Sequence, residues 1–174
     1  MKLEYKDICI RNIENKDLEQ LATWWNDGSI MAHAGFPNGL GISVKEIEEK
    51  IKNDSDDTRR RLIIEYKDKL IGEMNYSICE NHVYEIGIKI CDSSYQEKGF
   101  GRIILSMLIE ELFNRGANLI CLDTNLKNSR AQHIYELLGF KKVAIHKDSW
   151  RNQIGELQTT VDYELTRNDF HNFK

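Results

Sequence analysis

Two glycines and two basic residues lie together at the start of a long apolar stretch, and their types and spacing suit the binding of a phosphate group. They are Lys98, Gly99, Gly101 and Arg102. Glycines at a helix start let the backbone approach a ligand closely, and the first helical turn presents unpaired N–H groups at the positive end of its dipole. The spacing matches neither a P-loop nor a dinucleotide-binding turn. An ordinary strand-to-helix turn with a glycine start is the alternative interpretation.

A second candidate feature is the strand pattern just before this turn, residues 84–90, which contains Gly87. Ile86, Ile88 and Ile90 alternate with other residues, as expected for a strand with one face in a core. A glycine inside a strand often marks a bulge or a close backbone approach. A bulge that opens the sheet leaves main-chain N–H and C=O groups free, and an extended ligand that carries amides can pair with them as an additional strand.

These features resemble the Gcn5-related N-acetyltransferase (GNAT) superfamily over residues 5–165, most strongly over 83–143. The first motif of that family, Q/R-x-x-G-x-G/A, is matched by Gln96, Gly99 and Gly101. The second, N-x-x-A-x-x-x-Y-x-x-x-G-F, is matched by Asn128, Ala131, Tyr135, Gly139 and Phe140. The resemblance implies an enzyme that moves an acetyl group from acetyl-CoA to an amine.

The resemblance also implies which residues hold acetyl-CoA. Backbone amides of the glycine turn would bind the pyrophosphate, and main-chain groups of Ile88 and Ile90 would take the pantetheine arm. The N–H near Ile88 would polarise the thioester carbonyl, and Asn128 would contact the same arm or cap the next helix. The full set of expected cofactor-binding residues is Ile88, Lys89, Ile90, Gln96, Glu97, Lys98, Gly99, Phe100, Gly101, Arg102, Asn128, Ala131 and Tyr135.

Two side chains are the expected catalytic groups. Tyr135 shares a helix face with Ala131, and its phenol would protonate a leaving thiolate, because the reference pKa values of ~10 for phenols and ~8.5 for thiols are close. Glu85 would accept the amine proton, since an amine with a pKa of ~10.4 is only about one part in a thousand neutral near pH 7.4. The alternatives are a packing role for Tyr135, and a surface ion pair for Glu85 with a water relay as the base.

The acceptor site is expected where the first two helices and their loop meet the C-terminal part of the chain. Its candidate residues are Trp24, His33, Phe36, Glu85 and Trp150, with residues 148–153 closing the same pocket. Aromatic rings beside acids such as Glu46 or Glu49 suit a cation. The C-terminal segment resembles the branch that contains spermidine and ribosomal-protein N-terminal acetyltransferases. This likeness leaves open a polyamine, an aminoglycoside, another small amine and a protein N-terminus.

Composition limits the remaining classes. Of the 174 residues, 30% are charged and 41% hydrophobic, which is typical of one globular domain. A net charge of −4 argues against a nucleic-acid partner, and the sequence shows neither an apolar run of about 18–20 residues nor a signal-peptide pattern. The four cysteines are far apart, so we expect free thiols, no metal site and a cytoplasmic protein. Whether the chain forms a homodimer stays open.

The elements that must position these residues follow from periodicity and capping signals. Strands are expected at 8–11, 62–66, 70–78, 83–90, 119–124, 141–146 and 157–165, and helices at 17–25, 43–51, 99–115 and 130–138. The glycine-rich stretch 28–41 and the charged stretch 54–61 are expected to be loops. The alternation of strands and helices indicates an α/β layer fold.

The resemblance makes this fold specific. It implies a single GNAT-like domain over 1–174, with a mixed, mostly antiparallel sheet that is splayed at the cofactor strand and has helices on both faces. We therefore predict an N-acetyltransferase that uses acetyl-CoA and a small amine in a ternary complex. A protein N-terminal acetyltransferase and a non-catalytic acetyl-CoA-binding module are the alternative functions.

Overall fold

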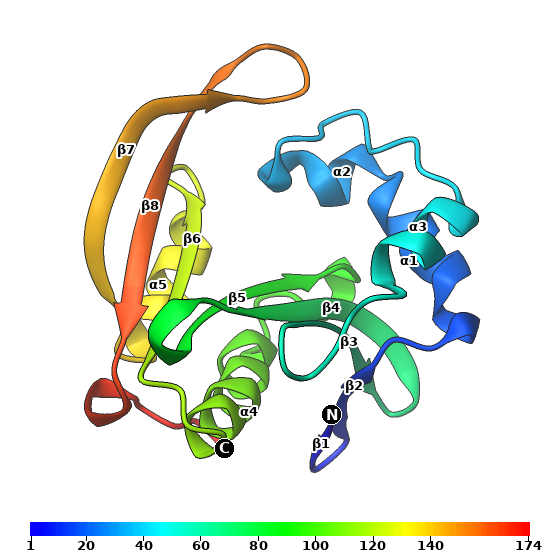
Figure 1. Ribbon diagram of the computed structural model, residues 1–174. Helices are drawn as coiled ribbons and strands as arrows, with labels where there is room; N and C mark the ends of the chain where they lie inside the picture. The colour runs from blue at the N-terminus through cyan, green and yellow to red at the C-terminus, as the bar shows by residue number, and fades with distance from the viewer.

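The computed structural model describes residues 1–174 as one eight-stranded sheet with helices on both faces (Figure 1). The strands are β1 (Lys2–Tyr5), β2 (Ile8–Asn12), β3 (Arg59–Tyr66), β4 (Lys69–Ile78), β5 (Val83–Ile90), β6 (Leu119–Asn125), β7 (Lys141–Arg151) and β8 (Leu157–Leu165). The helices are α1 (Leu18–Trp25), α2 (Gly28–Met31), α3 (Val44–Ile51), α4 (Phe100–Asn114) and α5 (Ser129–Leu137). No helix combines the length and apolar composition that a membrane span needs.

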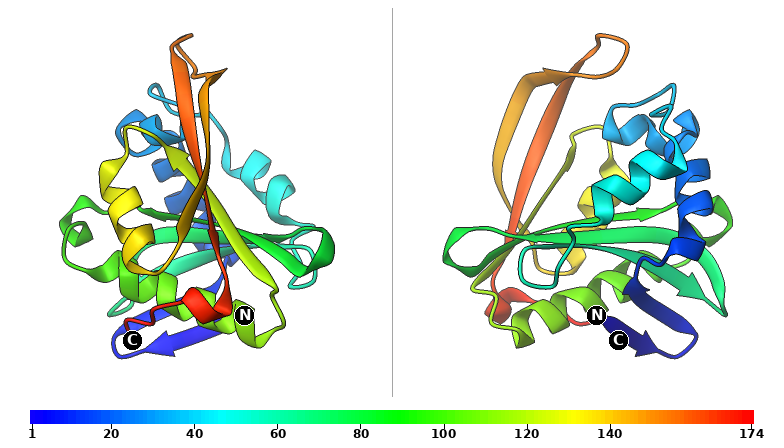
Figure 2. Two further views of the ribbon diagram at one scale, coloured as in Figure 1. Left: turned by 90° about the vertical axis from the view of Figure 1, so that its left-hand side faces the viewer. Right: turned by 45° about the vertical axis from the view of Figure 1, so that its right-hand side comes forward.

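The strand order is β1-β2-β3-β4-β5-β6-β8-β7, and every neighbouring pair is antiparallel except β5 and β6. The chain leaves β5, runs through α4 and returns as β6, which makes this one pair parallel. The predicted mixed, mostly antiparallel sheet is therefore confirmed. Figure 2 shows how β6, β8 and β7 rise steeply away from the flatter half that contains β1 to β5.

The two halves of the sheet separate at β5 and β6. These strands pair only at Val83 with Leu119, Tyr84 with Ile120 and Glu85 with Cys121. Beyond Glu85, β5 continues to Ile90 with only β4 as its neighbour, while β6 continues to Asn125 beside β8. The predicted splay is confirmed, and it places an opening between residues 87–91 and 123–125.

The bulge that the sequence suggested at Gly87 is not present. The β4–β5 ladder runs without a register shift, and Gly87 is paired with Asn75. A Cβ on Gly87 would lie 2.9 Å from the Asn75 side-chain nitrogen, so the glycine allows a close approach. The opening arises because β6 diverges from β5, which is a long-range event that no residue of β5 signals by itself.

Two apolar clusters hold the helices on opposite faces of the sheet. The larger one packs α4 and α5 against the sheet through residues such as Leu108, Leu112 and Leu138. The smaller one packs α1, α2 and α3 on the other face, around Leu21 and Ile47. Burial of both faces explains why the central strands β3 and β4 contain buried residues on either side.

Local signals start and end the helices as the sequence indicated. Ser43 and Glu46 form a reciprocal capping box at the start of α3. Gly116 and Gly139 follow α4 and α5 with φ values of 98°, the left-handed conformation that suits a glycine after a helix end.

Four segments differ from the sequence-based expectation. Strand β1 was not expected, and the 28–41 loop contains α2, which Asp27 caps by accepting a hydrogen bond from the Ser29 N–H. Strand β3 begins at Arg59, because Arg60 and Arg61 pair with acids of the preceding turn. Strand β7 continues beyond His146 to Arg151. In each case hydrogen bonds or ion pairs, several of them between residues close in sequence, extend order into a polar segment.

Candidate functional site

The glycine turn at the start of α4 has the geometry of an anion-binding site. Gly99 is the N-cap residue with φ 79°, a conformation that L side chains rarely adopt. Gly101 is buried, and a Cβ there would lie 3.3 Å from Ile134 Cδ1. No side chain caps this helix start, so its N–H groups are free for a ligand.

Two cations flank the same helix start without an acidic partner. Lys98 is exposed, and neither it nor Arg102 forms an ion pair. The Arg102 guanidinium instead lies 5.2 Å from the centre of the Phe173 ring. Positive charge at the N-terminal end of a helix is unfavourable unless an anion is bound there, so this arrangement favours a phosphate ligand.

Gln96 connects the turn to β5. Its Nε2 donates a hydrogen bond of 2.8 Å to the Ile90 carbonyl, which therefore points away from β4 and toward the opening. Main-chain groups alternate in direction along a strand, so the N–H and C=O of Ile88 point into the same opening. Free main-chain groups on this edge can pair with an extended amide-bearing ligand. Ile90 has one of its two carbonyl lone pairs already in use.

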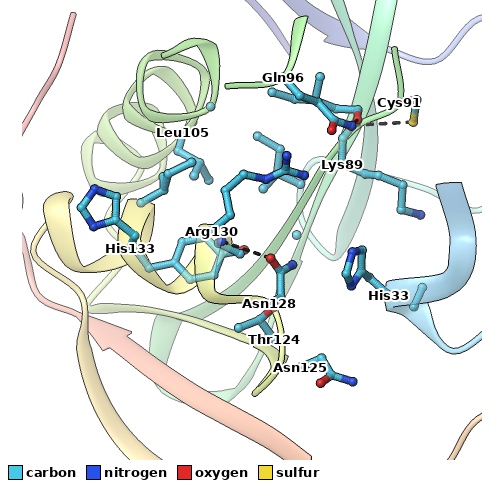
Figure 3. Close-up of a pocket in the computed structure, with 18 of the residues that line it drawn as sticks. His33, Lys89, Cys91, Gln96, Leu105, Thr124, Asn125, Asn128, Arg130 and His133 are labelled. Carbon is cyan, nitrogen blue, oxygen red and sulfur yellow. Dashed lines mark hydrogen bonds between the residues drawn. The ribbon is translucent and has the colours of Figure 1, made fainter. Parts of the chain in front are cut away.

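One large cavity of about 1590 Å³ occupies the opening between β5 and β6. Figure 3 shows His33 and Lys89 on one wall and Asn128 and Arg130 of α5 on another. Twelve of the thirteen expected cofactor-binding residues line it: Ile88, Lys89, Ile90, Gln96, Glu97, Lys98, Gly99, Gly101, Arg102, Asn128, Ala131 and Tyr135. The exception is Phe100, whose ring packs edge-on against Tyr66 and Tyr95 outside the cavity.

Tyr135 combines burial with an unpaired hydroxyl. It is 7% exposed, its ring contacts Tyr163 and Phe140, and it lines the cavity. Its phenol oxygen makes no hydrogen bond within the protein, whereas the Tyr163 hydroxyl donates one to Glu136. Burial first, and then the charge of Asp123, raises the pKa of Tyr135 to about 12. In the folded protein the pKa of Tyr135 is therefore well above the reference pKa of a thiol, so the close match expected from reference values does not hold.

Asn128 has the structural role that the sequence left open. Its Oδ1 accepts a hydrogen bond of 3.2 Å from the Ala131 N–H, so it is the N-cap of α5. It also lines the cavity. The cap fixes the start of α5, the helix that carries Ala131 and Tyr135. Contact of Asn128 with a cofactor stays a prediction.

The acceptor residues expected from the sequence fall into two groups. His33 and Trp150 line the cavity from opposite walls. Trp24 does not, because it is 5% exposed and packs in the core between α1, α3 and the sheet. Phe36 is also outside the cavity lining, at 38% exposure in the loop after α2. Trp24 is buried because it lies on the face of α1 that packs inward. The residue type by itself did not indicate whether this tryptophan would face the core or the cavity.

Glu85 lies at the edge of the opening and not in the cavity wall. It is exposed on β5, and it is the last residue there that pairs with β6. Glu46, a further acid considered for the acceptor site, caps α3 through Ser43. The position of Glu85 is compatible with proton transfer through water, and its role stays a prediction.

Asp123 is a carboxylate at the site that the sequence reasoning missed. It lines the cavity on β6, two residues beyond Cys121, and is directly opposite Asp162 of β8. Although Asp123 is open to the cavity, the protein packed around it raises its pKa, and the charges of Glu85 and Asp162 raise it further. An acid near the end of a strand whose first four residues are apolar was the available signal.

Three acids share one face of the sheet around the opening. Glu85 pairs with Cys121, and Asp123 pairs with Asp162, so strand alternation puts all three carboxylates on the face turned toward α1, α2 and α3. His146 Nε2 lies 2.6 Å from Asp162 Oδ2 at the outer end of this group. We call Glu85, Asp123 and Asp162 the acidic face.

The positive charge of Lys89, which lines the cavity, is largely neutralised by an acid. Lys89 Nζ lies 3.3 Å from Glu73 Oε1, and the same carboxylate accepts hydrogen bonds of 2.9 and 3.0 Å from the Trp25 Nε1–H. Lys89 also contacts the Met31 sulfur. The side chain is thus tied to α1 and α2, which leaves the acceptor end of the cavity with an excess of negative charge.

Comparison with known proteins agrees with this geometry. The model of the Acetyltransferase (GNAT) family matches residues 18–140. A stretch of 57 residues is 39% identical to [Ribosomal protein bS18]-alanine N-acetyltransferase of Escherichia coli strain K12. That match covers 33% of this chain and 38% of the relative, so it spans well under two thirds of the relative's length.

Two solved structures show the same fold. The spermidine N-acetyltransferase from Vibrio cholerae, in complex with CoA and spermine, has a TM-score of 0.84 at 24% identity and covers 95% of this chain and 98% of that one. The ribosomal L7/L12 alpha-N-protein acetyltransferase in complex with coenzyme A has a TM-score of 0.82 at 13% identity, over 95% and 98%. At these identities the likeness concerns the fold, and it spans nearly the whole chain.

Proposed function

Because this chain belongs to the acetyltransferase (GNAT) family, we propose that it transfers an acetyl group to a small primary amine by direct attack in a ternary complex. Its enzyme class is that of the family, with acetyl-CoA as the co-substrate. The observation that carries the proposal is the cavity between β5 and β6. It connects the uncapped start of α4 to Asp123 of the acidic face, and Tyr135, whose hydroxyl has no partner in the protein, lies along the way.

The residues present fit acetyl-CoA. The uncapped start of α4 with Lys98 and Arg102 suits its phosphates, and the free edge of β5 at Ile88 suits the amides of its pantetheine arm. Drug-sized ligand sites enclose about 300–1000 Å³. The cavity of about 1590 Å³ therefore has room for a long ligand and a second substrate.

Acid–base chemistry would come from the acidic face. Bound acetyl-CoA supplies a thioester whose carbonyl carbon is attacked by the neutral amine. Asp123 or Glu85 accepts the amine proton, directly or through water, and the raised pKa of Asp123 makes it the better matched base. The Ile88 N–H stabilises the negative charge that develops on the carbonyl oxygen. The Tyr135 hydroxyl donates a hydrogen bond to the departing sulfur, which leaves as thiolate or thiol.

Charge favours a cationic amine as the acceptor. The acidic face carries three carboxylates, and Asp27 of the α2 cap also lines the cavity. Lys89, which lines the cavity, is paired with Glu73, and His146 is paired with Asp162. A second ammonium group of a di- or polyamine would be attracted to these partly or fully exposed acids.

A protein N-terminus is the second candidate acceptor. The observation in its favour is the 57-residue match to an enzyme named as an alanine N-acetyltransferase of ribosomal protein bS18. Both candidates are primary amines, so the chemistry described above serves either of them. They differ in size and in charge around the reacting nitrogen, and both properties can be tested.

The test combines cofactor binding with turnover. We expect acetyl-CoA at about 100 times its Kd to stabilise the protein by roughly 2.7 kcal/mol, measured as a shift in thermal unfolding. Thiol release from acetyl-CoA is then followed with linear diamines, aminoglycosides and an N-terminal alanine peptide, and intact mass identifies the acetylated product. Thermal stabilisation without thiol release for any amine would point to a binding module and contradict the proposal.

A further inference from the structure

The hairpin between β7 and β8 reaches across the cleft and is attached to the loop after α2. Gln153, at the hairpin tip, donates its main-chain N–H to the Gly35 carbonyl at 2.8 Å. Its side-chain Nε2 donates to the Gly39 carbonyl at 2.9 Å, and its Oε1 accepts from the Asn38 N–H at 2.9 Å. One residue thus joins two segments more than a hundred positions apart. Figure 1 shows the hairpin curving over toward α2.

Trp150 forms a second contact between the same two segments. Its ring lies against the Cα of Gly35 so closely that a Cβ there would be 2.5 Å from Cζ3 and 2.7 Å from Cη2. Gly35 also has φ 96°, so glycine is needed both for the backbone and for the ring. The Trp150 Nε1–H donates to Thr160 Oγ1 at 3.0 Å, which holds the ring across the cleft. We call Trp150, Gln153 and residues 35–39 the roof.

The roof lies over the acceptor end of the cavity. Trp150 and Thr160 line the cavity on the β7–β8 side, and His33 and Ala34 line it on the α2 side. Asp123 and Tyr135 line the same cavity below them. Strand β5, the β6–β8 wall, α2 and the roof therefore surround the path by which an amine must reach the acidic face.

The hairpin tip holds its own shape without the roof contacts. The Asn152 Oδ1 accepts hydrogen bonds from the N–H groups of Ile154 and Glu156, and the Asn152 N–H donates to the Glu156 carbonyl. Arg151 Nη1 also donates to the Gly155 carbonyl. Removal of the Gln153 side chain should open the roof and leave the hairpin folded.

We infer that the roof limits the cross-section of the acceptor, so that the enzyme acetylates amines on unbranched chains and excludes amines that carry a bulky group close to the nitrogen. The inference rests on the proposed acetyl transfer and specifies its substrate class. An alkylammonium chain can enter beneath Trp150, whereas a caged or highly branched amine meets the Trp150 ring, which residues 35–39 and Gln153 hold in place from outside the cavity lining. Gln153 forms hydrogen bonds with the Gly35 and Gly39 carbonyls and with the Asn38 N–H. Displacement of the roof would break these bonds, which costs free energy.

The test compares two monoamines that differ in width, n-hexylamine and adamantan-1-ylmethylamine. We expect wild type to favour n-hexylamine in kcat/KM. In Gln153→Ala and Gly35→Ala the preference should fall by about tenfold or more, the range that steric discrimination in a pocket commonly reaches. Ile154→Ala is the matched control, because this residue is at the same tip, is 55% exposed and makes none of the hydrogen bonds to residues 35–39. Its preference should equal that of wild type.

A second readout does not depend on activity. With 5-fluorotryptophan in the full-length protein, Trp150→Phe assigns one of three fluorine resonances, and its H₂O/D₂O solvent shift reports ring exposure. The solvent shift of the Trp150 resonance should be small in wild type and Ile154→Ala, where the ring is protected from solvent, and larger in Gln153→Ala, where the ring is exposed. An exposed ring in wild type, or equal turnover of both amines by wild type, overturns the inference. A ring protected from solvent with no thiol release from these two amines or from any amine of the wider panel overturns the proposed function itself.

Discussion

Tyr135→Phe removes one hydroxyl and keeps a ring that the fold needs. The ring lies 5.7 Å from that of Tyr163 and 5.9 Å from that of Phe140, and both contacts are made by ring atoms that phenylalanine retains. The hydroxyl makes no hydrogen bond in the protein. We therefore expect unfolding free energy to change by less than about 1.5 kcal/mol, the usual limit for a volume-conserving change in a core.

The effect on turnover should be larger than the effect on stability. Because burial raises the pKa of Tyr135 to about 12, complete transfer of its proton to a thiolate with a reference pKa of ~8.5 is uphill by roughly 5 kcal/mol. The phenol acts instead as a hydrogen-bond donor to the developing negative charge on sulfur. A hydrogen bond to a charged group contributes ~1.5–3 kcal/mol, so kcat should fall by about 10- to 150-fold.

The assay is the initial rate of thiol release, with acetyl-CoA affinity measured by calorimetry and stability by thermal unfolding. The ratio of wild-type to mutant kcat should stay constant between pH 6 and about 10, because the phenol remains protonated throughout that range. Tyr163→Phe is the matched control, since its hydroxyl bonds to Glu136 and the residue does not line the cavity. Turnover of Tyr135→Phe close to wild type would refute the reasoning, and so would an equal loss in Tyr163→Phe.

The remaining predictions concern the glycine turn and the acidic face. Gly101→Asp should fold, since an acid suits a helix start, but should lose the acetyl-CoA thermal shift, whereas Gly101→Ala should keep most of it because only the end of the flexible Ile134 side chain must move. Arg102→Ala should weaken acetyl-CoA binding, measured by calorimetry, with a smaller loss at high salt. Asp123→Asn should raise the melting temperature at pH 7 and not near pH 3, because a carboxyl whose folded pKa is raised destabilises the native state once the pH exceeds its unfolded pKa of about 3.9. Asp123→Asn should also lower turnover. Glu85→Gln should lower turnover mostly at low pH, and the rate should partly recover as the pH rises, because more of the amine is then neutral. An unchanged pH–rate profile in both variants would exclude these acids from proton transfer.

Local spacing in the sequence predicted several residues that line the α4–α5 side of the cavity. The left-handed glycine at Gly99, the buried Gly101 and the N-cap at Asn128 depend on backbone conformation over a few residues, and residue type signals such conformations directly. The helical spacing of Ala131 and Tyr135 likewise predicted that both line one cavity wall. These features need no knowledge of how distant segments meet.

The acceptor end depended on tertiary structure. Asp123 joins the acidic face only because β8 returns antiparallel beside β6 with Asp162 in register, and that pairing links residues 39 positions apart. Trp24 became a core residue because α1 packs with that face inward. The roof exists because the β7–β8 hairpin is long enough to bring Gln153 to residues 35–39. Short-range residue preferences determine where a chain turns and caps, whereas the register and reach of distant strands decide which side chains meet across a cleft.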